Sequence, residues 1–384
     1  MKKDLVINPL AVLQIEESGD VISVGPVPGR GIRSLRVTSK DESHLHELFT
    51  DISGIGLGSL DIESDLDPRE IELLEECGVL VSSDGVPQRP LFSCQLDDVR
   101  GYADFSARLI VNPTFEYQPF DLTNFRSWIQ VRYLSPHQAT VWVTDAFTGI
   151  KWGYWLTTDQ AEIVAALKPS AEVPDTLDRA IVSKLFAAEV LVEPETVENR
   201  EEQTLAESFD QDRYVVVDNI IPPAQLRALQ NYYRAYCDQG LMRFGDDLVP
   251  GRFAQNDEPI ASHLRNGLTT LMNRIAPVPI KGTYSYSAVY IEGAELIPHL
   301  DRAACVYSFS LQLDYSPEPA DGISPWPLYV SANSPADADP RNDRAIHLSN
   351  GSCLVYKGRE LTHYRRPLPQ AHRSTSLFFH YVPA

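Results

Sequence analysis

The chain has 384 residues, enough for two or three domains, and its hydrophobic (43%) and charged (22%) contents are those of an ordinary globular protein. Its formal net charge of −20 opposes contact with phosphate backbones, so nucleic acid is excluded as the default partner. No run approaches the roughly 18 apolar residues of a membrane span, and acidic residues interrupt any secretory signal. We therefore expect a cytoplasmic protein without a membrane partner.

The cysteines agree with a reducing compartment. They are odd in number, scattered, and never spaced as C-x-x-C, which argues against a disulfide framework or a zinc knuckle. We interpret all five as small buried hydrophobic residues: Cys77, Cys94, Cys237, Cys305 and Cys353.

Residues 1–95 begin with short strand-like segments and continue with two helical patterns, at 39–53 and 67–77. In the second pattern Asp67 is a suitable N-cap, Pro68 occupies the first helical position, and a Val-Leu-Val strand follows. Helix, helix and a short hairpin predict a small winged-helix-like α+β domain. The second helix is acidic, whereas a DNA-reading helix would carry Lys or Arg.

Residues 96–195 predict a second α+β domain with a similar outline. Strand-like runs at 127–134, 139–146 and 150–157 precede a helix capped by Thr157 or Thr158. The segments LLEECGVLVSSDGVP and KLFAAEVLVEPETVE both pass from a helix end through Val-Leu-Val or its equivalent into a polar turn. The pattern favours an internal duplication, but helix-to-strand junctions often look alike, so both explanations stay open.

An acidic, polar segment at 196–212 predicts a linker or an exposed helix before the third domain, 213–384. That domain opens with a buried-type strand and two helices, the first starting at Pro222-Pro223. Short strands punctuated by Gly, Pro and Asn follow, which is typical of a sandwich or barrel. The predicted fold class is α+β: a C-terminal jelly roll with flanking helices, after one or two winged-helix-like domains.

The chemistry-bearing motif is His299-x-Asp301 at the end of a strand-rich run. Alternation along a strand puts these two side chains on one side. His363, after a later strand, completes a set of two histidines and one carboxylate, which can hold a metal ion and leave coordination positions open.

Arg373 follows His363 by ten residues and opens an apolar strand. Its guanidinium suits two parallel hydrogen bonds to a carboxylate, and Thr375, two residues on, can add a third. Tyr290 precedes the His-x-Asp motif and can also reach such a ligand. The competing histidines are less suitable because none has a fitting Arg after it: His347, His372 and His380.

In this order the four residues resemble the Fe(II)/2-oxoglutarate-dependent dioxygenases, in the branch that includes prolyl hydroxylases, over about residues 212–384. The resemblance implies a double-stranded β-helix, iron bound by His299, Asp301 and His363, and 2-oxoglutarate held at its far carboxylate by Arg373, with O2 as cosubstrate. Residues 326–344 lack the G-G-E-T-x-F pattern common in prolyl hydroxylases, so a prolyl substrate is not implied. The first half resembles the winged-helix domains that bind leader peptides in peptide-maturation enzymes.

The resulting hypothesis is an oxygenase that hydroxylates a side chain of a peptide or protein, such as the precursor of a ribosomal peptide natural product. Alternatives are a hydroxylase of a free amino acid or small natural-product intermediate, and a non-catalytic cupin-like binding protein. Zinc hydrolysis at a two-His, one-Asp site fits the ligands alone but not Arg373. The oligomeric state is open, with a homodimer as one option.

Overall fold

The structure is a computed structural model of the whole chain. It describes the following residues: 5–8, 12–15, 21–27, 31–37, 67–76, 78–83, 90, 92–102, 108–119, 139–174, 176–194, 200–245 and 249–384. The helix predicted at 39–53 and the strand predicted at 127–134 lie outside these residues. Within them, no helix combines the length and apolarity needed to cross a membrane.

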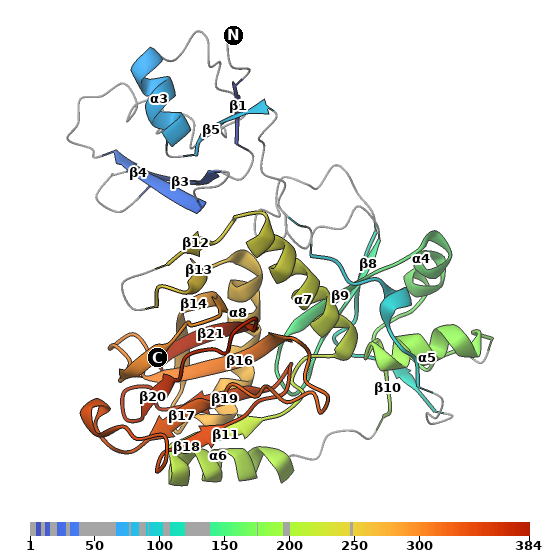
Figure 1. The fold of residues 1–384 in the computed structure, drawn as a ribbon. Helices are drawn as coiled ribbons and strands as arrows, with labels where there is room; N and C mark the ends of the chain where they lie inside the picture. Colours follow the sequence, from blue (N-terminus) through green and yellow to red (C-terminus); the bar gives the residue numbers. More distant parts are fainter. Residues whose placement is uncertain are drawn as a thin grey trace. The chain divides into compact units, whose positions relative to one another are not determined.

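The chain forms two compact units, residues 1–90 with 233–245, and residues 91–232 with 246–384. The first unit contains a three-stranded antiparallel meander, β2-β3-β4, and a separate two-stranded sheet, β1-β5 (Figure 1). Its elements are β1 (Leu5–Ile7), β2 (Val12–Ile15), β3 (Val21–Val27), β4 (Gly31–Val37), α3 (Pro68–Glu76), β5 (Leu80–Ser82) and β12 (Arg243–Phe244).

Helix α3 begins where the sequence predicts. Asp67 accepts hydrogen bonds from the backbone N–H groups of Arg69 (2.8 Å) and Glu70 (3.0 Å), and Glu70 accepts one from the backbone of Asp67 at 2.9 Å. This reciprocal arrangement is a capping box, which satisfies N–H groups that a helix leaves unpaired at its start. Leu74 is fully buried, so the helix packs through this side.

The second unit opens with a segment built in the same way, a meander β7-β8-β9 and a two-stranded sheet β6-β10. Thr157 caps α4 in a capping box with Gln160, as the sequence predicts. The elements are β6 (Ile110–Val111), β7 (Glu116–Gln118), β8 (Thr140–Thr144), β9 (Lys151–Trp155), α4 (Thr158–Ala165), α5 (Arg179–Ala187) and β10 (Leu191–Val192).

The two segments share more than their order of elements, because a buried asparagine occupies the same place in each. Asn8 follows β1, donates its side-chain amide to the carbonyl of Gly78 at 2.7 Å, and donates its backbone N–H to Val79. Asn112 follows β6 and makes the same two bonds, to Glu189 at 2.8 Å and to Val190.

The residues that receive these bonds also correspond. Gly78 and Glu189 both adopt positive φ at the end of a helix, where α3 and α5 stop. The strand that follows pairs in one register in both segments, Ile7 with Leu80 and Val111 with Leu191. The internal duplication is therefore confirmed over the described residues. That either copy is a winged helix stays a prediction.

Of the two structures predicted for the acidic segment at 196–212, a linker or an exposed helix, its described part forms the helix. Residues Arg200–Asp212 form α6, which contacts α8 and β11. Phe209 is fully buried, its ring 6.0 Å from that of Tyr307, and Lys357 lies over it at 5.8 Å. One apolar side of an otherwise acidic helix explains the packing. The compact units accordingly keep residues 91–232 together with the C-terminal sheets rather than dividing near 195–212.

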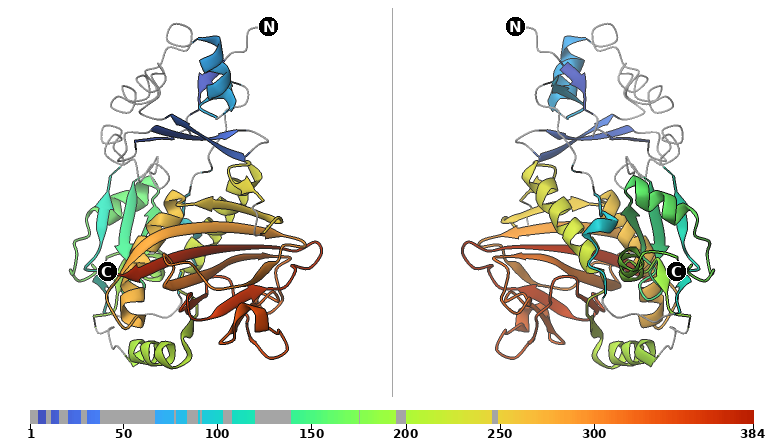
Figure 2. Two further views of the ribbon diagram at one scale, coloured as in Figure 1. Left: turned by 90° about the vertical axis from the view of Figure 1, so that its left-hand side faces the viewer. Right: turned by 90° about the vertical axis from the view of Figure 1, so that its right-hand side faces the viewer.

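Two antiparallel sheets make up the C-terminal part, a mixed α+β arrangement that agrees with the predicted fold class in its coarse form (Figure 2). In the larger sheet the strands β11-β19-β16-β21-β14-β13 are neighbours in that order, and the smaller sheet has the order β15-β20-β17-β18. The larger sheet contains β11 (Tyr214–Val217), β13 (Arg252–Asn256), β14 (Ile280–Ile291), β16 (Tyr307–Ser316), β19 (Cys353–Tyr356) and β21 (Arg373–Pro383). The smaller sheet contains β15 (Leu296–His299), β17 (Leu328–Ser331), β18 (Arg344–Ile346) and β20 (Thr362–Arg365). Two long helices accompany them, α7 (Pro223–Asp238) and α8 (Pro259–Ile275).

The core lies between these sheets, since buried clusters contain residues of both. One joins Tyr290 and Tyr315 of the larger sheet to Trp326, and another joins Leu354 to Leu328. The other side of the larger sheet faces α8, where Tyr381 donates a hydrogen bond to the carbonyl of Arg265 at 2.9 Å. Each strand of the larger sheet therefore has an inner side, toward the smaller sheet, and an outer side, toward the helices.

Candidate functional site

Two histidines meet where β15 and β20 pair. His299 and His363 are direct partners in this ladder, and their ring centroids are 4.2 Å apart. Each Nδ1 lies close to the carbonyl two residues earlier, Ile297 at 2.8 Å and Leu361 at 3.0 Å. A carbonyl only accepts, so each Nδ1 carries the proton and each Nε2 keeps a lone pair. Backbone acceptors of this kind commonly orient metal-binding histidines.

Asp301 joins them, but not through strand alternation. Strand β15 ends at His299, and the Asp301 backbone instead donates to the carbonyl of Gly358 at 2.8 Å. Its Oδ1 lies 3.6 Å from Nε2 of His363, and Ser308 donates to its Oδ2 at 2.5 Å. One ligand atom from each of His299, Asp301 and His363 falls within 4.8 Å of the others.

The charges of this cluster suit a divalent cation. Burial, followed by the proximity of His363, lowers the pKa of His299, so its imidazole is neutral at pH 7. Burial alone would raise the pKa of Asp301, but the proximity of His363 and the hydrogen bond from Ser308 outweigh it and lower this pKa. The cluster thus offers imidazole nitrogen and carboxylate oxygen in their metal-binding forms. This donor set fits iron, among other first-row metals.

A second group of possible ligands, with Cys305 and His380, shares Asp301. Burial raises the pKa of the Cys305 thiol, which lies 3.0 Å from the Tyr284 hydroxyl, and burial lowers the pKa of His380 to about 4. Ser308 donates to Asp301, so it accepts from Nδ1 of His380 at 3.1 Å. A protonated thiol is a poor ligand, which makes this group less suitable than the first.

The three residues predicted for the cosubstrate are not on one side of the sheet. Tyr290 is buried on the inner side and pairs with Ser374, which in turn pairs with Tyr315. Arg373 begins β21 and is the neighbour of Ser374, so alternation directs it, and Thr375 with it, to the outer side. The assignment of Arg373 and Thr375 to a cosubstrate stays a prediction.

Four residues near the site were not found from the sequence. Ser308 and Gly358 contact Asp301, Arg252 lies over the rings of Tyr286 (5.0 Å) and Tyr290 (5.7 Å), and Arg365 is buried on β20. For Arg365 a signal existed, because it lies two residues after His363 and strand alternation puts both on one side. Nothing local in the sequence marks the other three.

Apolar side chains lie exposed beside the histidine of β15. Ile297 is 51% exposed and Leu300 is 44% exposed, on either side of His299. Arg302 is also exposed, with its guanidinium 4.7 Å from the ring centroid of Tyr284. Two apolar side chains and one cation are therefore exposed close in the chain to His299 and Asp301, which are themselves partly exposed.

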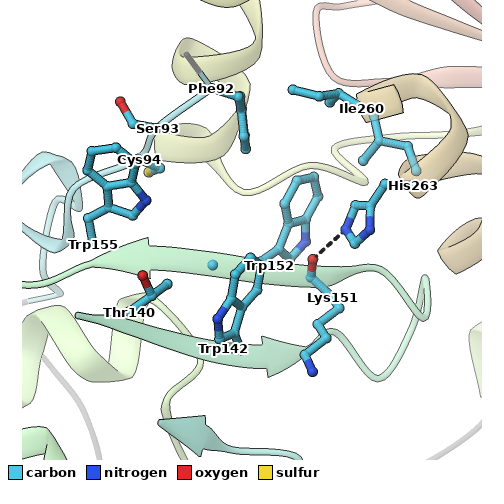
Figure 3. Close-up of a pocket in the computed structure, with 12 residues that line it drawn as sticks. Phe92, Ser93, Cys94, Thr140, Trp142, Lys151, Trp152, Trp155, Ile260 and His263 are labelled. Carbon is cyan, nitrogen blue, oxygen red and sulfur yellow. Dashed lines mark hydrogen bonds between the residues drawn. The ribbon is translucent and has the colours of Figure 1, made fainter. Parts of the chain in front are cut away.

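A separate cleft lies on β8, β9 and α8 (Figure 3). Trp142, Trp152 and Trp155 line it, and Nε2 of His263 donates to the carbonyl of Lys151 at 2.8 Å. Burial raises the pKa of the Cys94 thiol in its wall to about 12, so this thiol is not a nucleophile. The cleft has room for about one water molecule, too little for a substrate.

No protein-family model matches this chain, and no curated protein matches it. Solved structures resemble about half of it. A prolyl-4-hydroxylase of Pseudomonas putida aligns at 15% identity and a TM-score of 0.37, over 48% of this chain and 99% of that one. The prolyl hydroxylase of Trichoplax adhaerens, in complex with a hypoxia inducible factor peptide fragment, aligns at 15% identity and a TM-score of 0.39, over 48% of this chain and 90% of that one. The α-ketoglutarate-dependent epimerase SnoN of nogalamycin biosynthesis aligns at 14% identity and a TM-score of 0.40, over 49% of this chain and 85% of that one.

At such identities and TM-scores the likeness assigns no activity to this chain, so we base the function on the residues of the site.

Proposed function

We propose that the protein is an Fe(II)- and 2-oxoglutarate-dependent oxygenase that uses O2, with His299, Asp301 and His363 as the iron ligands. One observation carries the proposal: one ligand atom from each of His299, Asp301 and His363 lies within 4.8 Å of the others, and each histidine has its Nδ1 at a backbone carbonyl, which leaves its Nε2 free to bind a metal. Such a set leaves coordination positions open for a bidentate cosubstrate and for O2. When bound, the iron supplies oxidation of a substrate carbon–hydrogen bond coupled to decarboxylation of 2-oxoglutarate.

The chain's own residues bind the metal ion, orient its ligands and shield the cosubstrate from water. Carbonyls 297 and 361 fix the two imidazoles, and Ser308 fixes the carboxylate of Asp301 at 2.5 Å. The buried side chains between the two sheets keep water away from the cosubstrate, which prevents unproductive reactions. The exposed apolar residues Ile297 and Leu300 receive the substrate.

We assign a peptide or protein side chain as the substrate, in line with a ribosomal peptide precursor. The support is the duplicated small α+β segment, an addition that an oxygenase of small molecules does not need. Solved structures that resemble this chain include one bound to a peptide fragment and others from nogalamycin biosynthesis, so their titles leave both substrate classes open.

The test of the oxygenase proposal is an anaerobic titration of the apo protein with Fe(II) and then 2-oxoglutarate. We expect a weak visible charge-transfer band that appears only when both are present. His299→Ala and His363→Ala should each abolish it, whereas His347→Ala, at an exposed histidine outside the cluster, should leave it unchanged. A band that survives in both ligand variants contradicts the assignment.

The test of the substrate class uses a chain shortened at residue 90, the limit of the first compact unit, with a thermal melt to check folding. Under the peptide proposal the shortened protein still converts 2-oxoglutarate to succinate in the absence of substrate, but its KM for the peptide rises. An unchanged KM removes the first copy from substrate binding.

A further inference from the structure

Arg365 is a cation enclosed between the two sheets, two residues after His363 on β20. Side chains at positions i and i+2 of a strand project to one side, so Arg365 shares the side of His363. It is 2% exposed and belongs to the largest fully buried side chains of the described residues. A charge in such a place is strongly unfavourable unless a counter-ion compensates it.

The protein compensates this charge only in part. The guanidinium carbon lies 4.4 Å from the ring centroid of Trp326, and Nη1 donates to the Trp326 carbonyl at 2.8 Å. The Nε atom is buried and has no hydrogen-bond partner. In the parts of the chain that the structure describes, no ion pair includes Arg365. One donor of the guanidinium therefore points into the interior without an acceptor.

The side chains that surround Arg365 bring further donors. Tyr290, Tyr315 and Tyr356 lie near enough to act on it electrostatically, and of these the Tyr315 hydroxyl already forms a hydrogen bond with Nδ1 of His372 at 2.6 Å. The Tyr290 ring packs on Trp326 at 5.1 Å, and the Tyr356 ring packs on His363 at 4.8 Å. A guanidinium beside phenol hydroxyls, with no carboxylate among them, is complementary to an anion with two oxygens.

Arg373, the arginine that the sequence favours, is placed differently. Tyr286 and Phe378 face each other across β14 and β21 with ring centroids 6.3 Å apart, and both pack against the inner cluster of Tyr290 and Trp326. On β21, the residues an even number of positions from Phe378 therefore project to the inner side. Arg373 is five positions from Phe378, so alternation directs its side chain to the outer side.

We propose that Arg365, rather than Arg373, binds the far carboxylate of the dicarboxylate cosubstrate. The inference rests on the proposed function, which supplies the dicarboxylate. Two residues along a strand separate the bases of His363 and Arg365 by about 7 Å, the scale of a five-carbon diacid. The strand β20 then holds a metal ligand at one end and the anion-binding residue at the other.

The experiment measures dissociation constants by anaerobic calorimetry on the full-length protein loaded with Mn(II). It compares 2-oxoglutarate with pyruvate, which keeps the chelating 2-oxo acid but lacks the far carboxylate. The native protein should prefer 2-oxoglutarate. Arg365→Met should weaken 2-oxoglutarate binding roughly a hundredfold, as expected for a lost charge-assisted pair, and leave pyruvate binding unchanged.

Two matched variants decide between the cations. Arg373→Met and Arg252→Met remove the same charge at two other arginines of the larger sheet, and both should keep the preference for 2-oxoglutarate. If Arg373→Met or Arg252→Met loses the preference and Arg365→Met keeps it, the inference is wrong while the proposed function stands. If the native protein binds Mn(II) but neither 2-oxo acid, or binds no metal, the proposed function itself is wrong.

A further variant covers the case in which Arg365→Met does not fold, as a thermal melt will reveal. Arg365→Lys keeps the charge but has no planar fork for two parallel hydrogen bonds. A tenfold or greater loss of the preference in Arg365→Lys supports the inference, and an unchanged preference overturns it.

Discussion

A β-carbon at position 358 would overlap Oδ2 of Asp301, a contact that real β-carbons essentially never make. The added β-carbon would also lie 2.6 Å from Oγ of Ser308. Gly358 also accepts the backbone hydrogen bond of Asp301 at 2.8 Å. The carboxylate thus keeps its position only because residue 358 has no side chain.

Gly358→Ala should therefore weaken Mn(II) or Fe(II) binding at least tenfold, since the Asp301 carboxylate must move. Overpacking should also cost about 1–3 kcal/mol of unfolding free energy. The control is Gly322→Ala, where φ is +72° and nothing lies within 4 Å of the added carbon. That variant should lose about 1 kcal/mol through backbone strain and keep its metal affinity, as measured by calorimetry and thermal melts.

Ser308→Ala should lower metal affinity by about tenfold to a hundredfold, because the hydroxyl that orients Asp301 at 2.5 Å is removed. The matched control is Ser310→Ala on the same side of β16. Its hydroxyl is buried without a hydrogen-bond partner, so the change should leave metal affinity unchanged. Equal effects of the two variants would argue against an orienting role for Ser308.

The pH dependence of stability should carry a contribution from His380. Burial holds its folded pKa at about 4, below the ordinary histidine value of 6.5, while Asp301 opposes the shift and His363 and Arg302 add to it. Between these pH values the unfolded chain binds more protons than the folded chain, so the free energy of unfolding rises with pH across the window. As pH falls from 6.5 to about 4, His380 should cost about 3 kcal/mol.

His380→Asn tests this contribution, because the amide can still donate to Ser308 but does not titrate. Denaturant titrations between pH 4 and 7 should give a shallower slope for the variant. A residual slope is expected from His299, whose pKa is lowered in the same direction. Asp301, with a pKa lowered from 3.8, adds to the slope only below about pH 5. An unchanged slope in the variant would contradict the role of His380.

Asn8 and Asn112 each make the same hydrogen bonds within a different compact unit, so replacing either one should lower the free energy of unfolding of its own unit. Asn8→Ala should cost about 1–3 kcal/mol, because a buried carbonyl of Gly78 loses its donor. Asn112→Ala should cost at least as much, since its side chain also accepts from the backbone of Thr114 at 2.8 Å. Hydrogen exchange should show the loss of protection in residues 5–8 and 78–82 for the first variant and in 110–112 and 189–192 for the second. Loss spread over both sets in either variant would contradict this.

The sequence predicted the helix starts, most C-terminal strands and the meeting of His299, Asp301 and His363, because caps and strand alternation are local properties. It gave the wrong reason for Asp301, which is positioned by a turn and by Gly358 rather than by alternation. It favoured Arg373 from spacing alone. Which side of β21 a residue occupies depends on its pairing with β14 and β16, both of which contain register shifts that no local pattern reveals.

The similarity of the two duplicated segments means that, during folding, a strand of one copy can pair wrongly with a strand of the other. Strands β5 and β6 are neighbours in the chain, yet each pairs with a more distant partner, β1 or β10. Both sheets are antiparallel, use the same register and are followed by an asparagine that makes the same bonds. Each strand could therefore also pair with the corresponding strand of the other copy. Tandem copies of this kind are prone to exchange strands. Divergence of all but these few shared contacts protects the chain, and making the two copies more alike should produce swapped species during refolding.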